Sequence, residues 1–194
     1  MGGTLTAEEI FRRVGAVLDG HFLLTSGLHS PTYWEKAQVL QYPNYTELLC
    51  HFIVDHFRDK GIQVVAGPTI GGVILAYEVA KQLGTRAIFA EREGETRVFR
   101  RGFSISSGER VLIVDDILTT GGSLRQMVDA VIGIGGDPAG IGILVDRSTD
   151  KIDIGIPLFS CHQAIVPTYK PGPETCPQCR AGIPLTKRGS SGQP

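Results

Sequence analysis

Short apolar runs alternate with longer amphipathic segments through the centre of this sequence, and this order restricts the fold more than any other feature. The predicted strands are the apolar runs at 62–66, 86–90, 111–114, 141–145 and 158–160. Helical spacing of apolar residues predicts helices over 72–83 and 122–134. Strands separated by helices form βαβ units, so we predict an α/β fold with a doubly wound, mostly parallel sheet flanked by helices. Such sheets bind ligands at the carboxyl ends of their strands.

The N-terminal third predicts two helices and an irregular segment. Residues 6–19 begin with a capping box and continue with apolar residues at helical spacing, so we expect a helix there. Residues 43–60 predict a second helix that ends at Gly61. Between them, residues 21–40 mix Ser, Gly, Pro and aromatic residues, which indicates short strands and loops.

Composition excludes several classes of protein. The 194 residues, 42% of them hydrophobic, suit one globular domain with a core. A net charge of -1 argues against a nucleic-acid-binding surface. Residues 1–6 lack the start of a secretory signal and no apolar stretch is long enough to span a membrane, so we expect a cytoplasmic protein. The 25 glycines, without a repeat, indicate tight turns and close backbone approaches.

The most informative motif is Arg-Val-Leu-Ile-Val-Asp-Asp-Ile-Leu-Thr-Thr-Gly-Gly-Ser at residues 110–123. Its predicted strand brings Asp115 and Asp116 to a carboxyl end, and a turn rich in hydroxyl groups and glycine then opens a helix. The backbone N–H groups of that turn and the hydroxyl groups within 119–123 suit a phosphate monoester. The two glycines let the backbone approach the phosphate closely.

The carboxylates of Asp115 and Asp116 repel phosphate and therefore suit another group. They can bind the vicinal hydroxyls of a ribose, or a divalent cation held between sugar and pyrophosphate, because Mg²⁺ prefers oxygen ligands and substrate phosphates. The motif thus predicts a site for a ribose 5-phosphate that carries a metal-bound group. It has neither the ending of a Walker P-loop nor the glycine spacing of a dinucleotide fingerprint. An ordinary buried strand followed by a capped helix is the alternative.

Residues 111–123 closely resemble the phosphoribosyl pyrophosphate motif of the type I phosphoribosyltransferases. Three other segments are similar to the orotate phosphoribosyltransferase family: the Phe-Leu-Leu-Thr-Ser-Gly segment and aromatics at 22–34, the Gly-Pro-Thr-Ile-Gly-Gly loop at 67–72, and Asp-Arg at 146–147. The motif Cys-Pro-Gln-Cys-Arg-Ala-Gly-Ile-Pro-Leu resembles one bacterial branch of that family. The resemblance covers most of residues 10–188.

The resemblance implies a type I phosphoribosyltransferase fold with a small N-terminal hood and a flexible flap. We expect the phosphoribosyltransferase domain over 1–166, with its hood at 1–42 and its flap at 91–109, followed by a Pro- and Gly-rich tail over 167–194. The flap segment interleaves arginine, glutamate and glycine, which fits a polar hairpin that closes over the site. In the family this flap reaches the neighbouring subunit, so a homodimer is implied.

The implied reaction converts orotate and phosphoribosyl pyrophosphate into orotidine 5′-monophosphate and pyrophosphate, a step of pyrimidine biosynthesis. Mg²⁺ would bind mainly through the pyrophosphate substrate, and no side chain is assigned as a metal ligand. The phosphoribosyl pyrophosphate-binding residues would be Asp115, Asp116, Ile117, Leu118, Thr119, Thr120, Gly121, Gly122 and Ser123. Orotate would meet Thr119, Arg147, Tyr33 and Trp34. The catalytic cations would be Arg92, Arg97 and Arg101.

The sequence departs from the family pattern in the flap, which has neither Lys nor His between Glu91 and Glu109. Its arginines supply positive charge but no proton donor, because the arginine side chain does not lose its proton near neutral pH. Thr25 and Gly71 also stand where many members have a basic residue. Two alternatives follow: a phosphoribosyltransferase for another base, which the role of Arg147 argues against, or a non-catalytic phosphoribosyl pyrophosphate sensor, which the net charge of -1 disfavours.

Cys176 and Cys179 have the spacing of a zinc knuckle, but a complete structural site needs four ligands. Cys161 and His162 could supply the other two. Free thiols or a disulfide within the tail are the preferred alternatives, and four cysteines in a chain of this length do not form a disulfide scaffold.

Overall fold

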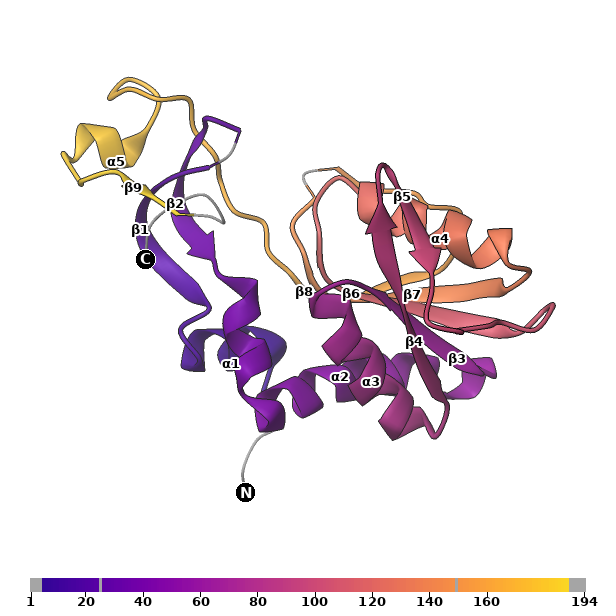
Figure 1. Ribbon diagram of the computed structural model, residues 1–194. Helices are drawn as coiled ribbons and strands as arrows, with labels where there is room; N and C mark the ends of the chain where they lie inside the picture. Colours follow the sequence, from indigo (N-terminus) through magenta and orange to yellow (C-terminus); the bar gives the residue numbers. More distant parts are fainter. Residues whose placement is uncertain (1–4, 25, 149, 189–194) are drawn as a thin grey trace.

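The computed structural model describes residues 5–24, 26–148 and 150–188. Thr25, the first four residues of the predicted hood and the last six of the predicted tail lie outside the described residues. Figure 1 shows a larger lobe built on a six-stranded sheet and a smaller lobe that combines the N-terminal strands with the C-terminal segment.

The helices are α1 (Ala7–Arg13), η1 (Lys36–Gln41), α2 (Pro43–Phe57), η2 (Arg58–Lys60), α3 (Gly71–Leu83), α4 (Gly122–Gly133) and α5 (Pro177–Arg180). The strands are β1 (Val17–Leu23), β2 (His29–Trp34), β3 (Val64–Pro68), β4 (Arg86–Glu93), β5 (Thr96–Phe99), β6 (Arg110–Leu118), β7 (Asp137–Asp146), β8 (Leu158–Gln163) and β9 (Thr186–Lys187). No helix of the described ranges is long and apolar enough to cross a membrane.

The large sheet has the strand order β5-β4-β3-β6-β7-β8. All neighbours are parallel except β5, which pairs antiparallel with β4. From β3 the chain moves outward to β4, whereas from β6 it moves the other way to β7 and β8. The prediction of a doubly wound, mostly parallel sheet is confirmed, and the switch point where ligands bind in such sheets lies between β3 and β6.

Helices cover both faces of this sheet, because successive strand residues point to opposite sides. Val65 and Leu112 belong to the core that packs against α2 and α3, whereas Val64 and Ile113 belong to the core on the α4 side. Figure 1 shows α2 and α3 on one side of the sheet and α4 on the other.

Two glycines of β7 let α2 approach the sheet closely. A Cβ on Gly140 would lie 2.3 Å from Cε1 of Phe57, and one on Gly142 would lie 2.5 Å from Cγ2 of Ile53. Both distances are shorter than any normal contact, so larger residues would push the helix away. Part of the glycine excess therefore serves packing inside the protein.

The helix predicted over 6–19 is wrong in its second half. The capping box at Thr6 is present, but α1 ends at Arg13 and Gly15 takes a left-handed φ of 69° that stops the helix. Val17 then pairs with Trp34, so the chain continues as β1 instead. The next helix matches its prediction, because α2 and η2 end at Gly61, which has a φ of 64°.

The Pro- and Gly-rich tail contains the short helix α5 and the strand β9. β9 adds to β1 in parallel, so the smaller lobe has the strand order β2-β1-β9. Tyr169 also forms an isolated antiparallel bridge with His29. The C-terminal segment is thus part of the lobe that carries the N-terminal strands.

Candidate functional site

Two acidic side chains lie at the switch point. The strand predicted to end at residue 114 continues to Leu118, so Asp115 and Asp116 lie within β6 and point to opposite faces. Each is only 8% exposed. The Asp115 carboxylate accepts hydrogen bonds from the N–H of Asp116 at 2.8 Å and from the Ser123 hydroxyl at 3.5 Å. The site therefore begins with two buried carboxylates.

The segment after β6 forms an open helix start. Gly121 is the N-cap of α4, with a left-handed φ of 80°, and no side chain of the described structure caps the helix. The first N–H groups of an uncapped helix have no intrahelical partner and attract anions. Thr119 and Thr120 are exposed beside them. This geometry suits a phosphate group.

The loop between β3 and α3 closes tightly on itself and on Asp116. A Cβ on Gly67 would lie 2.0 Å from the carbonyl oxygen of Gly72, and one on Gly71 would lie 2.6 Å from Oδ2 of Asp116. The N–H of Thr69 donates to the carbonyl of Ala90 at 3.1 Å, which ties the loop to β4. These glycines are therefore required by contacts inside the protein.

Arg97 is the flap arginine that reaches this site. From β5 its guanidinium lies 3.4 Å from Oγ1 of Thr69, 3.5 Å from the Thr69 carbonyl and 3.5 Å from Oγ of Ser123. Its Nε is buried and has no hydrogen-bond partner among the described residues. The guanidinium thus joins the β3–α3 loop to the start of α4, and its Nε–H group makes no hydrogen bond within the described residues.

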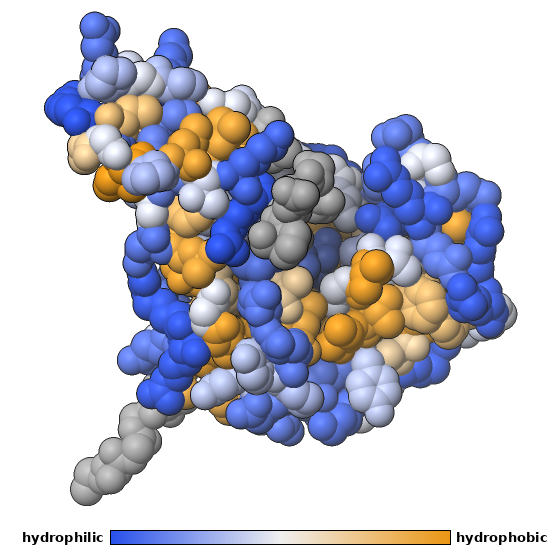
Figure 2. All heavy atoms as spheres, turned by 60° about the vertical axis from the view of Figure 1, so that its left-hand side comes forward, coloured by the Kyte–Doolittle hydropathy of each residue, from blue (hydrophilic) through white to orange (hydrophobic). Residues whose placement is uncertain are grey.

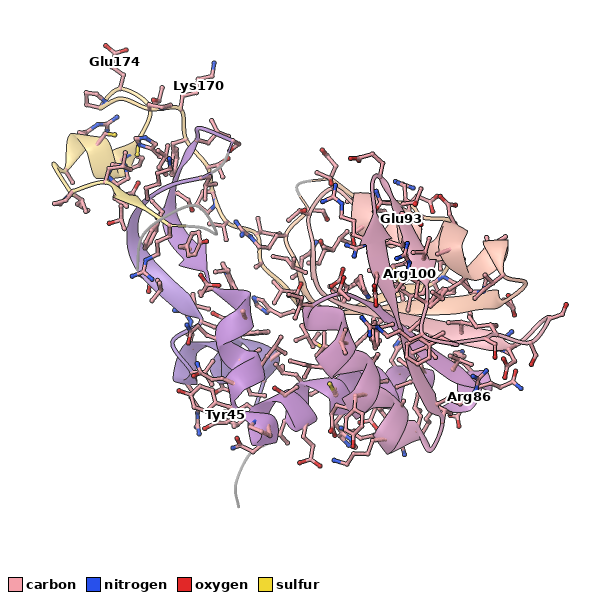
Figure 3. All side chains as sticks on the ribbon, in the orientation of Figure 1. Tyr45, Arg86, Glu93, Arg100, Lys170 and Glu174 are labelled. Atoms are coloured by element: carbon pink, nitrogen blue, oxygen red, sulfur yellow. The ribbon has the colours of Figure 1, made fainter. Side chains whose placement is uncertain are left out.

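The other flap arginines pair with glutamates of the flap itself. Arg92 contacts the carbonyl of Gly94 and the Glu95 carboxylate, and its side chain is 63% exposed. Arg101 donates to Glu91 at 2.5 Å. Figure 3 shows Glu93 and Arg100 together on the β4–β5 hairpin. The structure therefore does not bring Arg92 and Arg101 to the site as it brings Arg97.

Tyr33 of β2 and Arg147, just after β7, are near enough to interact electrostatically. The backbone N–H of Arg147 donates to the Leu118 carbonyl at 2.8 Å, which places the side chain beside the end of β6. Burial lowers the pKa of Arg147, and burial raises the pKa of Tyr33 while the charge of Arg147 opposes that rise. This pair offers a half-buried cation and an aromatic ring.

Trp34 lies elsewhere, which corrects the expectation that it flanks a substrate ring. Its side chain is 6% exposed and packs edge-on against Phe11 and in a stack with His162, at 5.3 Å between ring centroids in each case. Tyr33 and Trp34 are neighbours in β2, so their side chains point to opposite faces, and that of Trp34 points into the core. Trp34 is a core residue of the hood.

Cys161 and His162 do not join the other cysteines, which corrects the ligand set considered from the sequence. The Cys161 thiol lies 3.4 Å from the Leu49 carbonyl, and burial raises its pKa to about 12. Cys176 and Cys179 are not linked by a disulfide. They meet two histidines of the β1–β2 hairpin, as described below, and sequence spacing gave no signal for that meeting.

Comparison with known proteins agrees with this geometry. A family model described as "Phosphoribosyl transferase domain" matches residues 36–170. The orotate phosphoribosyltransferase of Pelotomaculum thermopropionicum is 52% identical over 96% of this chain and 98% of its own. That of Caldanaerobacter subterraneus is 50% identical over 94% of this chain and 95% of its own.

Solved structures show the same fold. The Mycobacterium tuberculosis orotate phosphoribosyltransferase in complex with inorganic phosphate has a TM-score of 0.67 and 26% identity. The match covers 81% of this chain and 94% of that one.

Proposed function

The chain belongs to the orotate phosphoribosyltransferase family, and we propose that it transfers the phosphoribosyl group of phosphoribosyl pyrophosphate to orotate. The products are orotidine 5′-monophosphate and pyrophosphate, and the reaction serves pyrimidine biosynthesis in the cytoplasm. The observation that carries the site assignment is the pair of buried carboxylates beside an uncapped helix start at the sheet's switch point.

The two halves of the sugar phosphate would bind to different parts of this site. The 5-phosphate lies at the start of α4, where N–H groups and the hydroxyls of Thr119, Thr120 and Ser123 converge. Asp115 and Asp116 accept hydrogen bonds from the ribose hydroxyls. Ile117 and Leu118 belong to β6 and hold these groups in register through their backbone.

Charge development determines what the remaining residues do. As the bond between C1 of the ribose and pyrophosphate breaks, negative charge grows on pyrophosphate and positive charge on the sugar. The hard oxygen donors of Asp115 and Asp116 fit Mg²⁺, which would neutralise part of the pyrophosphate charge when bound with that substrate. Arg97 supplies a fixed cation at the same end, and the terminal nitrogens of its guanidinium can donate to a leaving oxygen.

Orotate would lie between the two lobes, with its carboxylate on Arg147 and its ring beside Tyr33. A guanidinium donates two parallel hydrogen bonds to a carboxylate, which favours an acidic pyrimidine over a neutral base. Figure 2 shows the hollow that separates the lobes on this side. Thr119 is exposed at the end of β6 and can meet the same ring.

A homodimer would cover an apolar stripe on α3. Ile70, Ile74 and Tyr77 follow one another at helical spacing and are 83%, 42% and 68% exposed. Stripes of this kind on a soluble protein mark association surfaces. The outer part of the β4–β5 hairpin, with Arg92 and Arg101, would then reach the neighbouring subunit, whereas Arg97 serves the chain's own site.

Turnover is tested by following the loss of orotate absorbance with phosphoribosyl pyrophosphate and Mg²⁺. We expect turnover with orotate and none with adenine or hypoxanthine. Turnover with a purine would support a different base specificity. Binding of phosphoribosyl pyrophosphate without any turnover would support the sensor instead, in line with the flap's lack of Lys and His.

A further inference from the structure

A group of histidine and cysteine side chains lies in the smaller lobe, away from the site described above. His21 of β1, His29 of β2, Cys176 at the N-cap of α5 and Cys179 within α5 form this His/Cys cluster. Their candidate ligand atoms all lie within 4.8 Å of one another, and three of the four residues are buried. Two ligand pairs thus come from opposite ends of the sequence and meet at one point.

Three nitrogen–sulfur distances within the cluster match those around a zinc ion. Cys176 Sγ lies 3.6 Å and Cys179 Sγ 3.7 Å from His21 Nε2, and Cys179 Sγ lies 3.3 Å from His29 Nδ1. Bonds of about 2.05 Å to nitrogen and 2.3 Å to sulfur around a tetrahedral ion place the two kinds of ligand about 3.6 Å apart. Two nitrogen and two sulfur atoms form a complete structural set.

The two imidazole nitrogens lie closer than they would around a metal. His21 Nε2 and His29 Nδ1 are 2.8 Å apart. Tetrahedral geometry requires about 3.3 Å, so the rings must separate by about 0.5 Å when an ion enters. A movement of that size is within the range of a side-chain adjustment.

A second contact fixes the protonation of His21 in the form that binds metal. Its Nδ1 lies 2.7 Å from the carbonyl oxygen of Ile183, which can only accept, so Nδ1 carries the proton. Nε2 therefore carries a lone pair, which faces both thiols and Nδ1 of His29. Zinc-binding histidines usually donate their other N–H to such an acceptor, which orients the ring.

The C-terminal segment has few apolar contacts that hold it to the β1–β2 hairpin. Its strand β9 has two residues, α5 has four, and no apolar residue of α5 or β9 is buried. Ile183 and Leu185 between them are 44% and 45% exposed. Figure 3 shows Lys170 and Glu174 pointing outward at the tip of this lobe. Small units with such cores are commonly held by a metal or by disulfides.

We propose that His21, His29, Cys176 and Cys179 bind one structural Zn²⁺ that fastens the C-terminal segment to the β1–β2 hairpin. All four positions are protein ligands, so the ion has no open position for a substrate. Binding exchanges the thiol protons for the metal, without any change of oxidation state.

Cobalt provides the direct test on the full chain. Reduced, metal-free protein is titrated with Co²⁺, and we expect one ion per chain with the visible absorption of tetrahedral cobalt and a thiolate charge-transfer band. Zn²⁺ should displace it, and Cys179→Ser and His29→Ala should weaken binding at least about tenfold, since loss of even an outer-shell partner costs 10–100-fold. The matched controls Cys161→Ser and His162→Asn should bind as the wild type does.

Two further measurements keep the proposal testable if a variant does not fold. Protein purified under reducing conditions should contain one zinc ion per chain by mass spectrometry. Trypsin should cleave the metal-free wild type after the exposed Arg180 and Lys187 faster than the zinc-loaded protein. The proposal would be overturned if the protein held less than one metal ion per chain after exposure to zinc, or if a Cys176–Cys179 disulfide formed instead. It would also be overturned if trypsin cleaved the metal-free and zinc-loaded proteins at the same rate.

Discussion

Replacement of Arg97 by alanine should reduce turnover far more than it reduces stability. The contacts of the guanidinium with Thr69 and Ser123 are 3.4–3.5 Å long, beyond the usual 2.7–3.2 Å range, so they add little to folding. We expect a loss of at most about 1 kcal/mol in the free energy of unfolding. A fixed cation in a water-excluded site contributes about 10²–10³ in kcat, or about 2.7–4 kcal/mol.

The assay is steady-state kinetics with orotate, phosphoribosyl pyrophosphate and Mg²⁺, together with urea denaturation of each variant. Arg97→Lys should recover part of kcat, because it restores the charge without the planar fork. Arg100→Ala is the matched control from the same hairpin, because Arg100 pairs with Glu93 and is not among the arginines assigned to a site. Its exposed ion pair contributes about 0–1 kcal/mol to folding, and it is given no role at the site, so its kcat should stay close to that of the wild type.

The comparison between the two arginines decides the matter. A variant Arg97→Ala that keeps a third or more of wild-type kcat, or an equal loss in Arg100→Ala, would refute the idea that Arg97 meets the leaving group.

Three other outcomes are expected. Tyr77→Glu should convert a dimer into a monomer in light scattering, because a charge then lies in the apolar stripe of α3; an unchanged mass would exclude this interface. Gly142→Ala should lower the unfolding free energy by about 1–3 kcal/mol through overpacking against Ile53, and should be nearly neutral in Ile53→Ala, as a double-mutant cycle in urea can show. Burial lowers the pKa of His162, so the folded protein binds that proton less readily than the unfolded chain and loses stability as pH falls below about 6.5. His162→Phe keeps the stack on Trp34 and should reduce the change in unfolding free energy between pH 7 and pH 5. An unchanged pH dependence would contradict this.

The sequence predicted the order of the sheet's elements well, because apolar runs and helical spacing are local signals. The helix α2 with its stop at Gly61 shows how a capping glycine fixes an end. The first helix was overextended, because Val17 and Leu18 fit helical spacing and strand pairing equally well. Only the partner strand, with Trp34 opposite Val17, decides between them.

The sequence predicted the part of the site that lies within one continuous segment. Asp115, Asp116 and the turn that follows are contiguous, so their chemistry could be read together. The choice among flap arginines could not, because it depends on which side of a hairpin faces Thr69. Local spacing pointed to Cys176 and Cys179 as a metal-binding pair, but not to His21 and His29, which lie more than a hundred positions away in the sequence.

The pairing of β1 with β9 has a consequence for synthesis of the chain. β1 is synthesised long before its partner Thr186–Lys187. Until then one edge of β1 remains without its neighbour, and an unpaired edge is a template for aggregation. The hood of a nascent chain therefore stays incomplete while the larger sheet already has all its strands.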